Sequence, residues 1–206
     1  MDHRHGFPVP ARIHRVEEVI QRSRFVTTVA RAPSSEAAHA FVQRMRDEFP
    51  DATHHCWAFV AGPPGSTRAV GMSDDGEPHG TAGRPMLTTL LHSGGGEIVA
   101  VCTRYYGGTK LGTGGLSRAY SGGVKLALES LPVEELMARP RVEVELGYPH
   151  VDGLQRILDE VGAELEHEVY GATVRYVARV PEIRLARFQR QLADLTGGEG
   201  RWKRQD

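Results

Sequence analysis

The sequence predicts an α+β protein with two domains, an N-terminal α/β domain and a C-terminal ferredoxin-like domain. In the last third of the chain, strand and helix patterns follow in the order βαββαβ, which is typical of the split βαβ motif. Earlier, a strand pattern, a glycine-rich segment and a helix pattern follow one another at 98–127. The segment 132–140 begins and ends with proline and is interpreted as a linker. We therefore expect domains at 1–131 and 141–206.

Composition limits the possible functions. The chain has 206 residues, of which 40% are hydrophobic and 25% charged, as in ordinary water-soluble domains. Its net charge of −1 excludes a protein that is basic as a whole, so any nucleic-acid binding must come from a local patch. The sequence contains neither an apolar signal segment nor an apolar run of membrane-spanning length. We therefore expect a cytoplasmic protein that does not act in a membrane.

The start of the chain gives one weak and one clear strand pattern. Residues 1–10 are rich in His and Pro and are expected to form a loose tail that includes His3 and His5. A strand at 12–19 is only weakly indicated, because its alternation of apolar and polar residues is poor. The segment 25–30 is rich in β-branched residues and predicts a strand.

A helix and a hairpin are expected next. Ser34 or Ser35 can cap the helix, and Pro50 ends it. One face of this helix is apolar and carries Ala37, Ala38, Phe41, Val42 and Met45. The segments 53–60 and 67–72 are interpreted as two strands of a hairpin. In the first of these strands His54 and His55 face opposite sides, so the pair does not form a metal site; the two cysteines, Cys56 and Cys102, are expected to be buried free thiols.

A polar segment at 73–86 precedes a short helix expected at 86–92. Its carboxylates could bind Mg²⁺ or act as acid–base groups, although their spacing does not match an EF-hand loop. The alternative is an Asp-Gly turn followed by a helix that Pro85 opens. The residues singled out in this segment are Ser73, Asp74, Asp75, Gly76, Glu77, Gly80 and Thr81.

The glycine-rich segment is the strongest functional signal. Between Arg104 and Lys125 there are four basic residues and no acidic one. The glycines expected in the loop are Gly107, Gly108, Gly112, Gly114 and Gly115. The helix that follows has an apolar face made by Leu116, Ala119, Tyr120, Val124 and Ala127. A strand, a glycine loop and a helix together aim backbone N–H groups at an anion, so a bound phosphate is our first hypothesis; the alternative is that the glycines only allow tight turns and close packing.

Standard nucleotide-binding motifs do not fit this segment. A P-loop requires Gly-Lys-Ser/Thr, but Lys110 lies between Thr109 and Leu111. A dinucleotide motif that begins at Gly112 has Ser117 at the position of its third glycine. We therefore do not expect a classical nucleotide-binding domain.

Two long motifs resemble a known family. The segment SDDGEPHGTAGRPML at 73–87 and the segment TRYYGGTKLGTGGLSRAY at 103–120 closely resemble the signature of the IMPACT/YigZ family, and Ser23–Phe25 is similar to its early strand. The resemblance covers roughly 12–131, and the remainder is similar to the second domain of bacterial members.

The resemblance implies a fold and a general role. It implies an N-terminal fold similar to domain IV of elongation factor G and to a ribosomal-protein domain, and a second domain similar to domain V of that factor. Bacterial members are proposed to act in translation or to bind nucleic acid, and the family supplies no catalytic residues. Eukaryotic relatives regulate translation through a further N-terminal domain that this sequence does not show, so that role is not transferred.

The C-terminal elements support the second domain. A strictly alternating strand at 141–146 is followed by a helix that ends at Gly162. Strands at 164–170 and 173–180 form a hairpin, and a short strand at 199–203 completes the pattern. Pro181 is expected to open the second helix, which carries Ile183, Leu185, Phe188 and Leu192.

Three hypotheses for function follow. In the first, a non-catalytic protein binds RNA, the ribosome or a translation factor, and the carboxylates of the polar segment order its loop or pair with the basic residues. The contact residues of that hypothesis are Arg104, Tyr105, Gly107, Gly108, Lys110, Gly112, Gly114, Gly115 and Arg118. Of Tyr105 and Tyr106, at most one can stack on a base. In the second hypothesis an enzyme acts on a phosphorylated small molecule, with Mg²⁺ held by Asp74, Asp75 or Glu77. In the third, the chain is a protein-binding scaffold. No catalytic residue, metal site, cofactor or oligomeric state is assigned.

Overall fold

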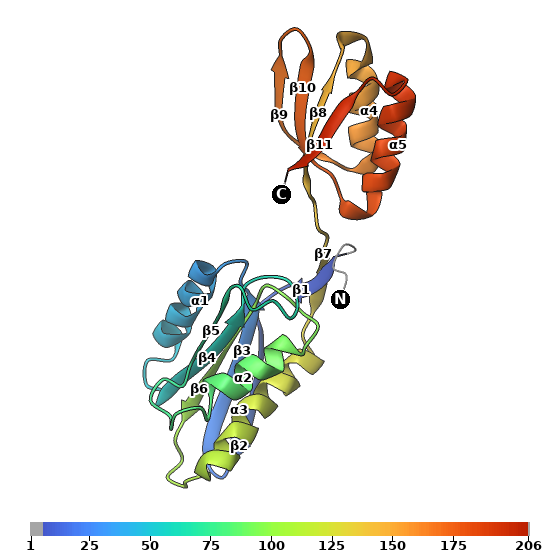
Figure 1. Cartoon of the computed structure of the whole chain (residues 1–206). Helices are drawn as coiled ribbons and strands as arrows, with labels where there is room; N and C mark the ends of the chain where they lie inside the picture. The colour runs from blue at the N-terminus through green and yellow to red at the C-terminus, as the bar shows by residue number, and fades with distance from the viewer. Residues whose placement is uncertain (1–5, 206) are drawn as a thin grey trace. The chain divides into compact units, whose positions relative to one another are not determined.

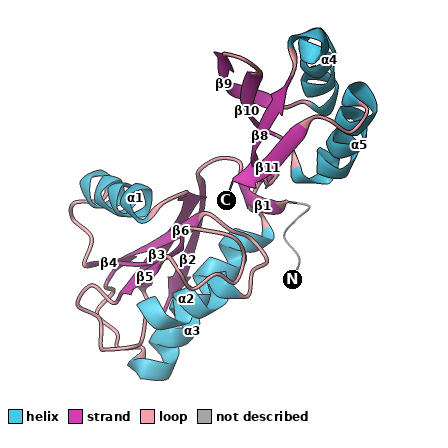
Figure 2. Cartoon of the chain, turned by 45° about the horizontal axis from the view of Figure 1, so that its top comes forward, coloured by secondary structure: helices cyan, strands magenta, loops and turns pink. Residues whose placement is uncertain are grey.

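The computed structural model describes residues 6–205, so His3 and His5 lie outside the described residues. The chain divides into two compact units, one of which spans Phe7–Leu136 while the other contains the chain from Met137 onward. Each unit has its own hydrophobic core. The fold is α+β, as the sequence predicts (Figures 1 and 2).

The first unit is built on a five-stranded antiparallel sheet in the order β2-β3-β6-β4-β5. The strands of this sheet are β2 (His14–Ile20), β3 (Ser23–Arg31), β4 (His54–Val60), β5 (Val70–Ser73) and β6 (Ile98–Tyr105). β6 lies in the middle and is buried along nearly its whole length, because helices cover both faces of the sheet. The residues that follow β6 therefore start from a rigid position.

Helices cover the sheet from both sides (Figure 1). The helix α1 (Ser35–Glu48) lies on one face, where Phe41 and Met45 are buried. Ser34 accepts a hydrogen bond from the Ala37 N–H at 3.2 Å, which confirms the predicted cap. The opposite face is covered by α2 (Gly83–Leu91) and α3 (Gly112–Glu129).

The predicted apolar face of α3 is confirmed, but the helix begins earlier than expected. Leu116, Ala119, Tyr120, Val124 and Ala127 are all buried against the sheet. Gly112, Gly114 and Gly115, which were expected in a loop, form the first turn of α3. The burial of the apolar face overrides the poor helix propensity of glycine in this turn.

The sequence patterns at the two ends of the first unit were misleading. The strand β1 (Phe7–Pro10) lies in the segment expected to be loose, and β7 (Val133–Leu136) lies in the expected linker. The two strands pair antiparallel, with Val9 opposite Glu134. Neither segment shows a strand pattern, because Pro8 and Pro10 interrupt one and β7 is mostly exposed.

The second unit is the predicted ferredoxin-like domain. Its sheet has the order β11-β8-β10-β9, and the elements follow along the chain as βαββαβ. The elements are β8 (Arg141–Leu146), α4 (Val151–Val161), β9 (Glu164–Tyr170), β10 (Val174–Arg179), α5 (Leu185–Thr196) and β11 (Arg201–Gln205). Short 3₁₀ turns at Tyr148–His150 and Glu182–Arg184 precede α4 and α5. Ile183 therefore lies in a 3₁₀ turn and is 56% exposed, so its expected place on the helix face was wrong.

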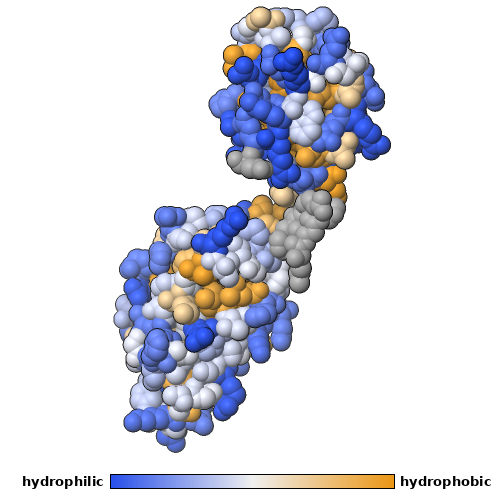
Figure 3. All heavy atoms as spheres, in the orientation of Figure 1, coloured by the Kyte–Doolittle hydropathy of each residue, from blue (hydrophilic) through white to orange (hydrophobic). Residues whose placement is uncertain are grey.

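The surface is largely polar. On the face drawn in Figure 3, hydrophilic residues predominate over both units, and hydrophobic residues are exposed in small areas. Within residues 6–205, none of the helices has both the length and the apolar character needed to cross a bilayer.

Both cysteine thiols are predicted to be unreactive in the native protein. Cys56 and Cys102 are register partners on β4 and β6 and are fully buried. Burial raises the pKa of both thiols, that of Cys102 to about 12, so the reactive thiolate is scarce at pH 8. Native protein should react with Ellman's reagent about 10³-fold more slowly than protein unfolded in guanidinium. Rapid modification of either thiol without unfolding would contradict this prediction.

Candidate functional site

Asp74 organises the first motif by capping the start of α2. Its Oδ2 accepts the Gly80 N–H at 2.7 Å, and its Oδ1 accepts the N–H groups of Ala82 and Gly83, both at 2.9 Å. Partial burial opposes ionisation of this carboxyl, but the three backbone donors outweigh it, and its pKa is lowered. Asp74 therefore replaces the side-chain cap that Ala82, the N-cap residue of α2, cannot supply.

Asp75 fastens the same loop to β4 and α1. Its Oδ2 accepts the backbone N–H of His55 at 2.7 Å, and its Oδ1 pairs with Arg46 Nη2 at 2.8 Å. The carbonyl of Asp75 contacts His54 Nδ1 at 2.8 Å. The loop also contains Gly76 and Gly80 at positive φ, and Thr81 Oγ1 donates to the Pro78 carbonyl at 2.6 Å.

Glu77 forms the buried centre of the site. Its Oε1 lies 2.5 Å from Arg104 Nη1 and accepts the Tyr120 hydroxyl at 2.6 Å. The side chains of Glu77 and Arg104 are only 4% and 5% exposed. Arg104 Nη2 also donates to Ser23 Oγ at 3.1 Å, and Ser23 Oγ accepts the Gly107 N–H at 3.2 Å. One ion pair thus joins both motifs, α3 and the start of β3.

These contacts change the expected roles of the charged residues. Arg104, expected among the phosphate contacts, is buried and paired in this structure. Asp74, Asp75 and Glu77 each have separate partners and do not converge on a common point. In the described part of the chain, no group of three or more His, Cys, Asp or Glu residues is arranged to hold a metal ion.

The two motifs meet at a cavity of about 480 Å³, here called the two-motif cavity. Glu77 and Pro78 line it from the first motif, and Arg104, Tyr106 and Lys110 line it from the second. The cavity is completed by Thr53, His54, Leu111, Gly112, Thr113 and Leu116. It therefore opens at the N-terminus of α3, where the first backbone N–H groups of a helix lack intrahelical acceptors.

The two adjacent tyrosines have different surroundings. The Tyr105 hydroxyl hydrogen-bonds Asp51 Oδ1 at 3.1 Å, and its ring lies under the Arg24 guanidinium. Tyr106 lines the two-motif cavity and is 47% exposed. Its ring centroid lies 5.4 Å from the guanidinium carbon of Arg104. Of the two tyrosines, Tyr106 is the one placed to contact a ligand in this cavity.

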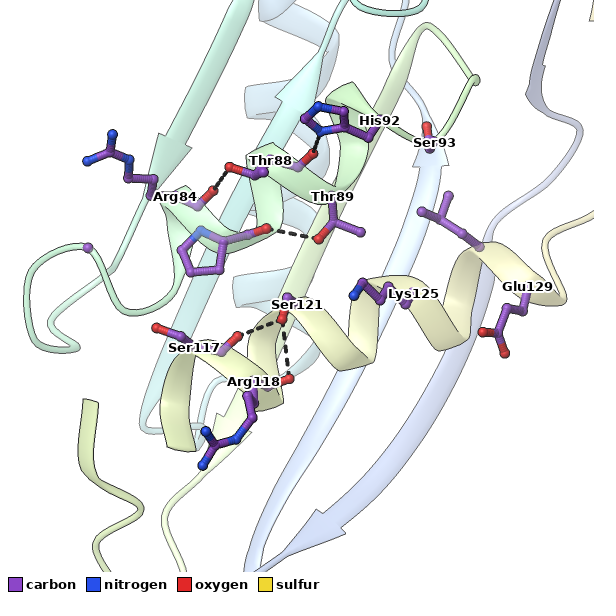
Figure 4. Close-up of a pocket in the computed structure, with 13 residues that line it drawn as sticks. Arg84, Thr88, Thr89, His92, Ser93, Ser117, Arg118, Ser121, Lys125 and Glu129 are labelled. Carbon is purple, nitrogen blue, oxygen red and sulfur yellow. Dashed lines mark hydrogen bonds between the residues drawn. The ribbon is translucent and has the colours of Figure 1, made fainter. Parts of the chain in front are cut away.

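A second depression, here called the helix groove, lies between α2 and α3 and has a volume of about 740 Å³. Figure 4 shows Thr89 on the side of α2 that faces α3, and Ser121 and Lys125 on the side of α3 that faces α2. Arg84 and Arg118 also line the groove, and their side chains extend outward.

Four exposed cations around these hollows carry no acidic partner. We call Arg84, Lys110, Arg118 and Lys125 the basic face. None of them forms an ion pair with any residue in 6–205. By contrast, Arg24 and Arg31 of the same unit pair with carboxylates. The basic face therefore has positive charge available for an anionic ligand.

The glycines of the second motif have different structural roles. A Cβ at Gly107 would lie 2.0 Å from the Arg22 carbonyl oxygen, so this glycine is required by close packing. Gly108 and Gly112 have φ values of +82° and +71°. A Cβ at Gly115 would lie 3.0 Å from that of Leu111, whereas at Gly114 it would meet nothing closer than 3.8 Å. Packing therefore explains Gly107 but leaves Gly114 unexplained.

Some lining residues were not predicted as site residues. Among them are His54, Pro78, Arg84, Tyr106, Thr113 and Lys125. Lys125 and Arg118 are seven residues apart on one helix face, which the sequence does show. The place of Arg84 depends on the packing of α2 beside α3, and no local pattern reveals that contact.

Comparison with known proteins gives the same two-part organisation. Residues 21–128 match the model of the Impact N-terminal domain, and residues 144–199 match a domain of unknown function, DUF1949. The chain is 44% identical over 190 residues to "IMPACT family member YigZ" of Escherichia coli, covering 92% of this chain and 93% of that protein. It is 34% identical to "IMPACT family member YvyE" of Bacillus subtilis, covering 89% and 83%. A solved structure described as a hypothetical protein superposes with a TM-score of 0.80 at 41% identity, covering 98% of each chain.

Removal of Glu77 is predicted to destabilise the first unit strongly. Glu77→Leu leaves the buried Arg104 charge unpaired, which typically costs about 3–5 kcal/mol of unfolding free energy. The double variant Glu77→Leu/Arg104→Met removes both charges and should recover much of that loss. Urea unfolding, followed by the fluorescence of Trp57 in a Trp202→Phe background, measures both effects.

Two controls complete this experiment. Glu17→Ala breaks the exposed ion pair with Arg24 and should barely change the urea concentration at the midpoint of unfolding. The second unit, followed by Trp202 in a Trp57→Phe background, should be unaffected. If the double variant were less stable than Glu77→Leu, the buried pair would not be the cause of the loss.

Proposed function

Because the chain belongs to the IMPACT family, which is linked in general to translation regulation, we propose that it binds RNA of the translation machinery. The RNA lies along the basic face, from the N-terminus of α3 to the helix groove. Such a partner places the protein in the cytoplasm. The observation that carries this proposal is the set of four cations without acidic partners around these two hollows.

The arrangement of charge supports binding of an extended anion. Arg118 and Lys125 lie on one face of α3, about 10 Å apart along the helix axis. Lys110 precedes the helix, and Arg84 lies across the groove on α2. A single phosphate cannot contact all four cations at this spacing, whereas a nucleic-acid backbone can. The hydroxyl groups of Thr89 and Ser121 lie between them; each donates its proton to a backbone carbonyl of its own helix, so each can accept a hydrogen bond from a ribose hydroxyl.

In the second unit, most cations of the sheet are paired with carboxylates. In its sheet, Arg141 and Arg179 both pair with Glu166, at 2.5 and 2.6 Å. Arg175 and Lys203 both lie near Glu143. These pairs neutralise much of the positive charge on that sheet, so we expect the main electrostatic contribution to RNA binding from the basic face of the first unit.

The salt dependence of RNA affinity tests the proposal. Each contact with a single-stranded phosphate contributes a slope of about −0.7 to the plot of log affinity against log salt. Lys110→Ala/Arg118→Ala should weaken binding to ribosomal RNA fragments and make the slope about 1.4 units less steep. Fluorescence anisotropy across a potassium chloride series measures both quantities.

A charge-matched variant serves as the control. Arg12→Ala/Arg44→Ala removes the same net charge beside α1, on the opposite side of the sheet, where neither arginine has an ion-pair partner among residues 6–205. This variant should retain the wild-type slope. Equal losses in the two double variants, or binding that does not depend on salt, would contradict the proposal.

Gly114→Ala separates RNA binding from stability. Because alanine is the better helix former and its Cβ meets only the flexible end of Arg118, at 3.8 Å, the variant should be more stable, by at most about 0.5–1 kcal/mol. The same Cβ stands between the exposed helix backbone and a phosphate, so RNA affinity should fall. A thermal melt and the anisotropy assay should therefore change in opposite directions. Unchanged RNA affinity would show that the backbone at Gly114 is not approached.

A further inference from the structure

The two-motif cavity combines an apolar wall with a positively charged end. Tyr106, Pro78, Leu111 and Leu116 supply the apolar and aromatic surface. Lys110 and the start of α3 supply the charge, since α3 has no side-chain cap at Leu111. Inorganic phosphate alone would make no use of the apolar wall, and a purely apolar ligand would make no use of the positive charge. The cavity therefore suits a flat ring that carries an anionic group.

The aromatic wall is held in place. Arg104 lies over the Tyr106 ring, and its guanidinium is fixed by Glu77 and Ser23. The backbone N–H of Tyr106 donates to Thr53 Oγ1 at 3.1 Å. A positioned ring loses little conformational freedom when a base stacks on it, which favours binding.

The buried arginine also points to a ligand with hydrogen-bond acceptors. Arg104 is 4% exposed and lines the cavity, yet its Nε–H has no acceptor among residues 6–205. An unpaired buried donor of this kind is unusual in a native protein. The Nε atom has almost no accessible surface, so a carbonyl oxygen or ring nitrogen of a nucleobase becomes its acceptor only when the Arg104 side chain turns toward the cavity.

We infer that the two-motif cavity binds one nucleotide, with its base against Tyr106 and its phosphate at Lys110 and the N-terminus of α3. The volume of about 480 Å³ is within the usual range for small-ligand sites. The identity of this nucleotide rests on the proposed function: if the ligand is RNA, it is an unpaired nucleotide of a single-stranded segment. A base stacked in a duplex cannot enter the cavity. The adjoining helix groove then receives the flanking backbone.

Free nucleotides test the inference without RNA. The full-length protein is titrated with AMP, CMP, GMP and UMP, and separately with ribose 5-phosphate and inorganic phosphate, while ¹H–¹⁵N spectra are recorded. At least one mononucleotide should bind at least tenfold more tightly than ribose 5-phosphate and shift the amide signals of Tyr106, Gly112 and Thr113. Equal affinity for mononucleotides and ribose 5-phosphate, or no mononucleotide binding at millimolar concentration, overturns the inference.

Variants separate the base site from the backbone contacts. Tyr106→Leu should weaken mononucleotide and single-stranded RNA binding about tenfold, and Tyr106→Phe should restore it because the ring is kept. Lys125→Ala should weaken RNA binding and leave mononucleotide binding unchanged. The reason is that Lys125 lines the helix groove but not the two-motif cavity. If RNA binds with the expected salt slope but Tyr106→Leu has no effect, the base site is wrong and the proposed function stands. If mononucleotides bind and RNA does not, the proposed function is wrong and the base site stands.

Discussion

The buried ion pair between Glu77 and Arg104 is the interaction on which the site depends. A charged group that is buried away from water needs an opposite charge nearby. Here the Glu77 carboxylate and the Arg104 guanidinium neutralise each other. Tyr120 and Ser23 satisfy further hydrogen-bonding positions of the same pair. Segments from distant parts of the sequence are therefore held in one arrangement, and burial raises the pKa of the Tyr120 phenol, which keeps it a hydrogen-bond donor.

The same pair explains why one cation of the second motif has a structural role while the others are available to a ligand. Arg104 is used inside the protein, where it fixes the wall of the two-motif cavity. Lys110, Arg118 and Lys125 are exposed and have no acidic partner in the described region. Cations that have no partner within the fold can attract an anionic ligand. Because they lie beside a rigid cavity wall, the bound ligand is also held in one orientation.

The sequence predicted those features that depend on local periodicity or on long motifs. The apolar face of α3 was visible because Leu116, Tyr120 and Val124 recur at helical spacing. The ferredoxin-like unit and the family were also identified correctly, the first from the order of elements and the second from two motifs. The burial of Arg104 was not visible, because its partner lies 27 residues away and no periodic pattern links them. Pairing of β1 with β7 was missed for the same reason, since both strands are short and only their distant partner stabilises them. The RNA-contact and nucleotide-contact roles remain predictions.

The antiparallel pairing of β1 with β7 also determines when the first unit can finish folding during protein synthesis. Phe7–Pro10 are made long before Val133–Leu136, yet they find this partner only when it has left the ribosomal exit tunnel. At roughly 5–20 residues per second, the first strand waits many seconds for that partner. The first unit therefore closes late, when synthesis of the second unit is already under way, and its folding is slowed by contacts between distant parts of the sequence. A nascent chain arrested before Val133 should thus expose an incomplete first unit to chaperones and proteases.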